Sequence, residues 1–206
     1  MKQSSLRSWI ITIIVMIFAN QVYVILGHLL PTLAEHTSSE LSTWQSGYRY
    51  GNLLVYSIVI AGWLISGIMV YKGDKENKMA IYGGGALIAY GGVGLLWQLL
   101  AIISNLFHTN LIPRPLFVTL TILTAVLMCA ALILIALYYG HRSLRNLAVA
   151  YTVLHVIYTT LYVWAQLLPP GNHYHIFSIY ALVAAAALII QLIYLFKWAK
   201  LIKNQE

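Results

Sequence analysis

The chain has 206 residues, of which 61% are hydrophobic and only 8% are charged. A soluble domain usually carries about 25% charged residues, so this composition excludes a water-soluble globular protein and predicts an integral membrane protein. The formal net charge of +7 does not indicate a nucleic-acid-binding protein, because the basic residues lie at the ends of apolar segments, where they set membrane topology.

Six long apolar segments follow one another along the chain, and short polar loops separate them. Their continuous apolar character excludes transmembrane strands, which alternate polar and apolar residues. Pro31 is expected to end the first segment, because proline removes a backbone donor from a helix. We therefore predict an all-α integral membrane protein without a soluble domain, a single unit over residues 1–206 whose transmembrane helices cover about 9–30, 48–71, 79–107, 115–139, 147–168 and 176–200.

The basic residues are distributed unequally between the two sides of this six-span arrangement. Ten of the twelve fall on the side that holds both termini: Lys2, Arg7, Lys72, Lys75, Lys78, Arg142, Arg145, Lys197, Lys200 and Lys203. Arg49 and Arg114 fall on the other side. Lysine and arginine concentrate in cytoplasmic loops, so we expect a multi-pass protein of the cell membrane with both termini in the cytoplasm.

Polar side chains form a stripe along the fifth segment. Tyr151, His155, Tyr158, Tyr162 and Gln166 are spaced i, i+4, i+7, i+11 and i+15, which places them within about 80° of one another around a helix. Unpaired polar groups are costly in hydrocarbon, so this stripe should face other helices. We expect the other spans to pack around the fifth helix.

Other uncharged polar residues lie at membrane depth in other segments, whereas the predicted spans contain no Asp, Glu, Lys or Arg. Such residues can form hydrogen bonds between helices, or they can line a pocket for a neutral or aromatic small molecule. The pocket hypothesis takes as ligand-binding candidates Asn20, Gln21, Gln98, Tyr151, His155, Tyr158, Tyr162 and Gln166.

The third segment is rich in glycine, and Gly85, Ala89 and Gly92 lie on one helical face at i, i+4 and i+7. Small residues let a neighbouring helix approach closely. We therefore expect this face to pack against another helix.

Histidines gather on the expected outer side and are weak candidates for a zinc or copper site: His28, His36, His108, His173 and His175. Their spacing matches no metal-binding motif, so no metal or other cofactor is predicted. The chain has no Gly-x-Ser-x-Gly, no His-Glu-x-x-His and no paired aspartates in a span, which favours a protein without catalytic activity.

In size and in the number of spans the chain resembles the substrate-capturing subunits of energy-coupling vitamin transporters. The first segment, WIITIIVMIFANQVYVILGHLL, contains one alanine and lacks the alanine-spaced docking face of those proteins, so the resemblance is architectural and implies no site residue.

Our first hypothesis is a protein that binds or transports a small neutral or aromatic solute. The alternatives are an accessory or scaffold subunit of a larger membrane complex and an outer-facing histidine metal site. The expected partners are the lipid bilayer, a solute, and other membrane subunits or a second copy of the chain, and not nucleic acid.

Overall fold

The computed structural model describes residues 3–37, 41–107, 113–167 and 174–204, and the side chains of these except 3, 23–50, 105, 166 and 174–178. The described residues form six α-helices: α1 (Gln3–Thr37), α2 (Leu41–Gly73), α3 (Lys78–Leu106), α4 (Arg114–Tyr139), α5 (Arg142–Leu167) and α6 (Tyr174–Lys203). All six are long and apolar enough to cross a membrane, which confirms the prediction of six apolar helices.

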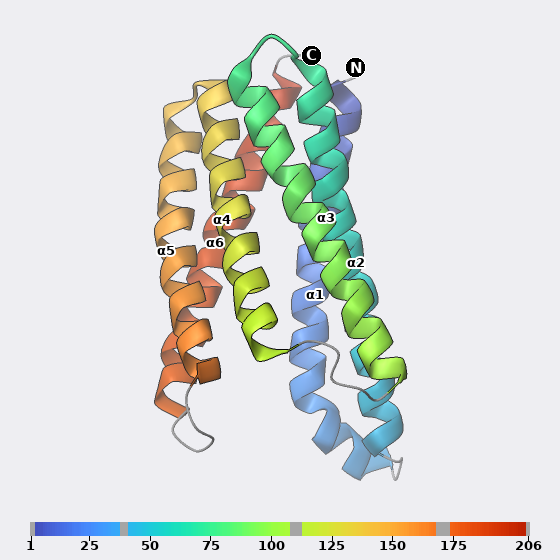
Figure 1. Cartoon of the computed structure of the whole chain (residues 1–206). Helices are drawn as coiled ribbons and strands as arrows, with labels where there is room; N and C mark the ends of the chain where they lie inside the picture. Colours follow the sequence, from blue (N-terminus) through green and yellow to red (C-terminus); the bar gives the residue numbers. More distant parts are fainter. Residues whose placement is uncertain (1–2, 38–40, 108–112, 168–173, 205–206) are drawn as a thin grey trace.

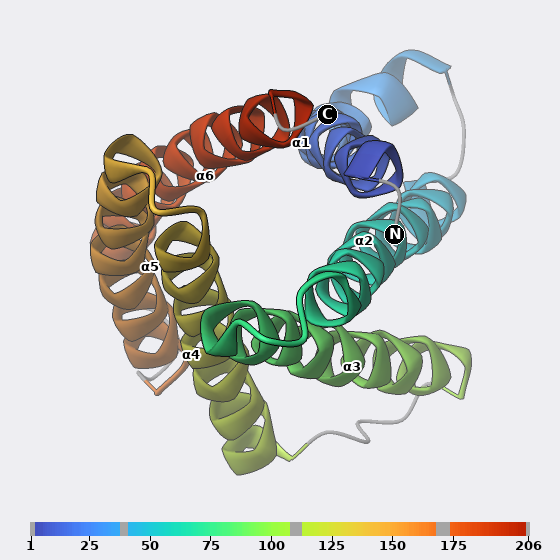
Figure 2. The same cartoon turned by 90° about the horizontal axis from the view of Figure 1, so that it is seen from above.

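The helices stand side by side in a ring (Figure 2). Each packs against its neighbours in the chain, and α6 closes the ring against α1. In the described part of the chain the backbones of no other pair of helices approach closely, so the expectation that the other spans pack around the fifth helix is wrong: α5 packs against α4 and α6 alone. Both termini, the α2–α3 turn and the α4–α5 turn therefore lie at one end of the ring (Figure 1). We call this the basic end, because the described lysines and arginines except Arg49 and Arg114 lie at or near it.

Local hydrogen bonds fix the two turns at the basic end. Asp74 accepts hydrogen bonds at Oδ1 from the backbone N–H groups of Glu76 and Asn77, and the Asn77 side chain caps α3 by accepting from the Met79 N–H at 2.9 Å. Gly140 ends α4 in the left-handed conformation, with φ of 65°, and its N–H donates to the Leu137 carbonyl. Short turns of this kind force the connected helices to run antiparallel.

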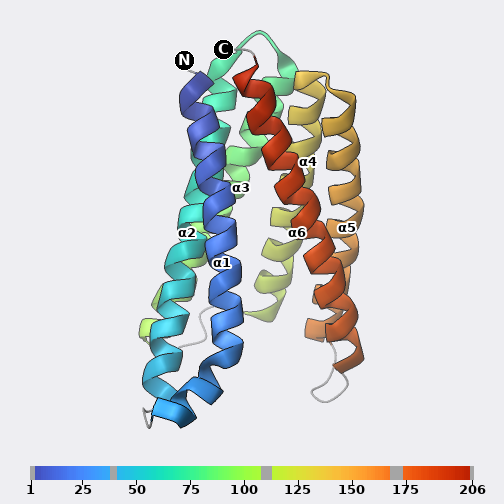
Figure 3. The same ribbon diagram turned by 180° about the vertical axis from the view of Figure 1, so that it is seen from behind.

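Several helices are longer than the apolar segments from which they were predicted. The prediction that Pro31 ends the first helix is wrong: α1 continues to Thr37, and its last turns bend away from the axis of the preceding turns (Figure 3). An internal proline kinks a helix because it removes one hydrogen bond and displaces the preceding turn. Two other helices begin before the predicted apolar segments: α2 begins at Leu41 and α5 begins at Arg142. Hydropathy marks the part of a helix that lies in hydrocarbon, whereas hydrogen bonding continues into the polar region.

The glycines of α3 that allow close packing are not the ones expected from the sequence. A Cβ atom at Gly84 would lie 2.5 Å from the Tyr71 backbone nitrogen, and one at Gly91 would lie 2.6 Å from the Leu64 Cβ. At Gly85 and Gly92 it would meet nothing within 4 Å. The expected packing face therefore points away from the bundle, because the crossing of α2 and α3 brings the adjacent glycine face into contact.

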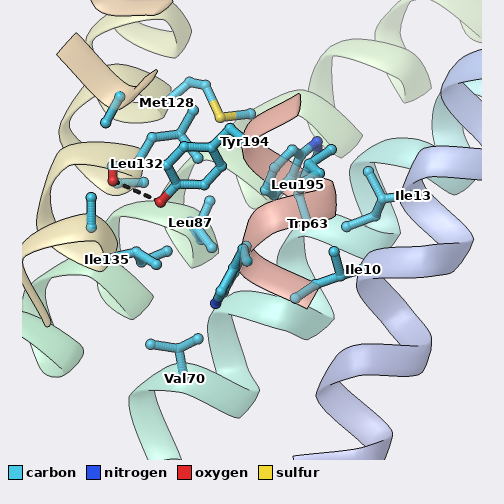
Figure 4. Close-up of a cluster of buried hydrophobic side chains, with 14 of the residues drawn as sticks. Ile10, Ile13, Trp63, Val70, Leu87, Met128, Leu132, Ile135, Tyr194 and Leu195 are labelled. Carbon is cyan, nitrogen blue, oxygen red and sulfur yellow. Dashed lines mark hydrogen bonds between the residues drawn. The ribbon is translucent and has the colours of Figure 1, made fainter. Parts of the chain in front are cut away.

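Large apolar side chains pack together inside the ring (Figure 4). Their positions along the helices place them in the half of the ring that contains the basic end. This plug includes side chains from α1, α2, α3, α4 and α6 that are buried almost completely: Ile10, Ile13, Trp63, Leu87, Met128, Leu132, Ile135, Tyr194, Leu195 and Trp198. The Tyr194 hydroxyl donates a hydrogen bond of 2.9 Å to the Leu132 backbone carbonyl and thereby ties α6 to α4 across the ring. A side-chain core closes this end of the ring.

Candidate functional site: an aromatic cavity inside the helix ring

The polar stripe of α5 forms a continuous stack of rings that faces the interior of the helix ring. The ring centroids of Tyr151 and His155 are 4.9 Å apart, those of His155 and Tyr158 are 5.5 Å apart, and those of Tyr158 and Tyr162 are 6.3 Å apart. Every pair is stacked, and these distances are typical of favourable aromatic contacts. Successive members of the stripe are three or four residues apart, which is about one helical turn, so each ring lies above the previous one.

A tyrosine of α6 joins this stack from the neighbouring helix. The Tyr180 ring lies 4.9 Å from that of Tyr158 and 5.6 Å from that of Tyr162. Its hydroxyl donates a hydrogen bond of 3.1 Å to the Tyr158 hydroxyl. The Tyr158 hydroxyl accepts this bond and keeps its own hydrogen for a further acceptor.

The stack extends to α4 and α3 on the other side. The Phe117 ring lies 5.8 Å from that of Tyr162 and 5.2 Å from that of Trp97. On α2 and α3, Tyr56 and Tyr90 also line the interior of the ring. Aromatic side chains from five helices thus surround the interior of the ring beyond the plug.

Two cavities lie against this aromatic cluster. The α1 cavity, of about 530 Å³, is bounded by α1, α2, α3, α5 and α6, and the α4 cavity, of about 260 Å³, by α2, α3, α4, α5 and α6. Six side chains line both cavities: Tyr56, Tyr90, Tyr151, His155, Tyr158 and Tyr180. Together the two cavities fall within the usual size range of small-molecule sites.

The plug forms the floor of both cavities. Trp63, only 1% exposed, lines the α1 cavity, and Met128, also 1% exposed, lines the α4 cavity. His155 lies thirteen residues after the start of α5 at Arg142, which is about 20 Å along the helix axis. The cavities therefore lie at mid-depth, and the described plug separates them from the basic end.

The described lining of the cavities combines apolar side chains with hydroxyl, amide and imidazole groups, and it carries no Asp, Glu, Lys or Arg. The Asn20 side chain on α1 lines the α1 cavity, and its Oδ1 atom has no hydrogen-bond partner among the described residues. Across this cavity lie Gln191 on α6 and His155 on α5. A neutral ligand with a hydrogen-bond donor would match these groups, whereas a charged one would lack a counter-ion.

The structure brings most of the sequence-predicted candidates together. Asn20, Gln21, Tyr151, His155 and Tyr158 line the α1 cavity, and Tyr162 lines the α4 cavity. Gln98 is not in the lining of either; it is 5% exposed, and its Oε1 atom has no partner among the described residues. The side chain of Gln166 lies outside the described residues.

Sequence reasoning did not single out several side chains of this site. Tyr56, Tyr90 and Tyr180 line both cavities, and Gln191 lines the α1 cavity. Each lies in a largely apolar segment, and none belongs to a polar stripe as long as that of α5. The available signal was a tyrosine or glutamine at mid-depth in an apolar span, a position that requires a protein or ligand partner.

The candidate histidine site lies outside the described side chains. His28, His36 and His175 are on described helices, but their side chains are not described, and His108 and His173 lie outside the described residues altogether. Among the side chains that are described, no three His, Cys, Asp or Glu residues gather.

Comparison of the chain with protein-family models, with curated proteins and with solved structures gives no match.

Proposed function

We propose that this chain is a multi-pass membrane protein that binds a small neutral aromatic molecule in the cavities beside Tyr158. Both termini and the basic end lie in the cytoplasm, and the ligand reaches the site from the opposite side or from the bilayer. The observation that carries the proposal is the continuous stack of Tyr151, His155, Tyr158 and Tyr180, whose side chains line both cavities, and the described lining of the two cavities carries no Asp, Glu, Lys or Arg.

Stacked rings favour an aromatic ligand, because a planar ring can pack face to face or edge to face with tyrosines. The hydroxyls and amides of the lining offer hydrogen-bond donors and acceptors that fix the orientation of such a ring. The Asn20 side chain lines the α1 cavity, and a carboxamide can donate a hydrogen bond to a ligand hydroxyl or accept one from it. A hydroxyl-bearing aromatic ring is the ligand chemistry that uses all of these groups.

The orientation rests on the charge distribution. The ends of α2 and α6 at the basic end carry Lys72, Lys200 and Lys203, and α5 begins there with Arg142 and Arg145. Basic residues are retained on the cytoplasmic side during insertion. Because the plug closes this same end, transport through the ring would require the plug to rearrange, whereas binding would not.

Titration of the full chain in lipid nanodiscs tests the proposal, with p-cresol as the neutral probe and 4-hydroxybenzoate as the anionic one. We expect saturable binding of p-cresol, detected by saturation-transfer NMR, and weaker or no binding of 4-hydroxybenzoate. The double variant Tyr158→Phe, Tyr162→Leu loses a hydroxyl and an aromatic face, which together contribute about 1–3 kcal/mol. Its affinity for p-cresol should fall about tenfold or more.

The Tyr82→Phe variant is the matched control. Tyr82 is 61% exposed and lines neither cavity, so p-cresol should bind this variant as it binds the wild type. Equal binding by the double variant and the wild type would refute the site. Preferential binding of the anionic probe would refute a neutral ligand. Absence of binding by both probes is the outcome expected for an accessory subunit without a ligand.

A further inference from the structure

An apolar groove runs along the outside of the ring between α4 and α5. It encloses about 760 Å³, and its lining includes Val126 and Ala130 from α4 and Val156, Val163 and Trp164 from α5. The groove faces away from the interior, so in a membrane it is filled by hydrocarbon. Its volume exceeds that of either interior cavity.

The groove and the α4 cavity lie on opposite sides of a thin wall. Ala125 on α4 and Thr159 on α5 line both of them. Thr159 is 8% exposed. Two small side chains therefore separate the polar, aromatic interior from an apolar surface that is continuous with the bilayer.

We propose that the ligand is an amphiphile from the membrane: a neutral, hydroxyl-bearing aromatic ring with a single long hydrocarbon tail. The ring lies against Tyr158 inside the helix ring, and the tail passes between α4 and α5 at Ala125 and Thr159 into the groove. This inference rests on the proposed function and adds to it the tail, its position and the bilayer as the source of the ligand.

Three features of the described residues favour one molecule that occupies both spaces. The α4 cavity and the groove share wall residues, and neither space is lined by a charged side chain. The polarity changes at this wall, from a lining with several hydroxyl groups to an almost entirely apolar one. A ligand with a polar ring and an apolar tail matches this change of polarity. A water-soluble solute would leave the groove to ordinary lipid chains.

The test compares p-cresol with 4-decylphenol, which carries the same neutral ring on a ten-carbon chain. The groove variant is Ala130→Phe, Val163→Phe, which fills the groove without changing either cavity lining. Its matched control is Val153→Phe, which adds a ring at an exposed position of α5 outside the groove. All forms are measured in nanodiscs of the same lipid, and their helix content and melting are compared by circular dichroism.

We expect the groove variant to bind 4-decylphenol at least tenfold more weakly than the wild type and the control do, while all three bind p-cresol equally. Equal binding of 4-decylphenol by all three proteins would overturn the tail position and leave the proposed function intact. Absence of p-cresol and 4-decylphenol binding by the wild type would overturn both proposals.

A second measurement does not depend on the folding of a variant. A 4-alkylphenol with a diazirine at the far end of its chain is photoactivated in the wild-type protein, and the labelled peptides are identified by mass spectrometry. We expect labels within residues 122–130 and 156–167, and we expect an excess of unlabelled 4-decylphenol to reduce this labelling. Labelling spread evenly over the outer faces of all helices would overturn the inference.

Discussion

The contact between α2 and α3 predicts that Gly84→Ala destabilises the protein, although alanine is the better helix former. The added Cβ would lie 2.5 Å from the Tyr71 backbone nitrogen and 2.8 Å from the Gly67 carbonyl oxygen. Ordinary contact begins at 3.4 Å, so the helices must separate locally by about 0.9 Å. Overpacking of this kind costs about 1–3 kcal/mol, and the higher helix propensity of alanine offsets at most about 1 kcal/mol.

Gly85→Ala is the control for this substitution, because it makes the same chemical change one residue along the helix. A Cβ atom there meets nothing within 4 Å, so this variant should be as stable as the wild type or slightly more stable. The chain's single cysteine, Cys129, is 7% exposed and provides the assay. A thiol-reactive fluorescent dye reports its exposure as the detergent-solubilised protein is heated.

We expect Gly84→Ala to unfold at a temperature several degrees below that of Gly85→Ala, with the wild type close to the latter. Equal unfolding temperatures for the two variants would refute the close approach of α2 and α3. A lower unfolding temperature for Gly85→Ala would mean that the face of α3 with Gly85, Ala89 and Gly92 carries the packing, as expected from the sequence.

Three further outcomes follow from the structure. Tyr194→Phe removes the donor to the Leu132 carbonyl and should lower the free energy of unfolding by about 1 kcal/mol, measured with the same thiol dye; an unchanged unfolding temperature would contradict a formed hydrogen bond. Asn20→Leu should bind p-cresol more weakly without loss of stability, because the Asn20 Oδ1 atom has no partner among the described residues; a large loss of stability would show that Asn20 is structural. A protease site added after Glu206 should be cleaved in inside-out vesicles and protected in right-side-out vesicles, and the reverse pattern would contradict the proposed orientation.

The sequence predicts the helices well because six segments are apolar over their whole length, and in a bilayer only helices or closed barrels satisfy every backbone group. The stripe on α5 was equally informative: its period alone implies that Tyr151, His155 and Tyr158 face the interior, and the structure places all three on the cavities.

The other cavity residues, the packing face of α3 and the bend of α1 depend on how the helices pack, which no single segment of the sequence contains. Tyr56 and Tyr90 belong to no long polar stripe, and only the packing of α2 against α3 brings them to the same cavity. The choice between the Gly84 and Gly85 faces depends on the crossing of two helices, because both faces are rich in small residues. The course of α1 past Pro31 shows that a proline can lie within a long helix and bend it.

Cysteine accessibility tests the central claim most directly, namely that an open polar site lies at mid-depth above a closed basic end. In a Cys129→Ala background, one cysteine replaces Ala184, which lines the α1 cavity, and in a second protein one replaces Ala136, which is 1% exposed beside the plug. With a membrane-impermeant methanethiosulfonate, we predict that Ala184→Cys reacts from the side opposite the basic end and is protected by p-cresol, while Ala136→Cys reacts from neither side. Reaction of Ala184→Cys from the basic end alone, or equal reaction of both cysteines, would contradict the account.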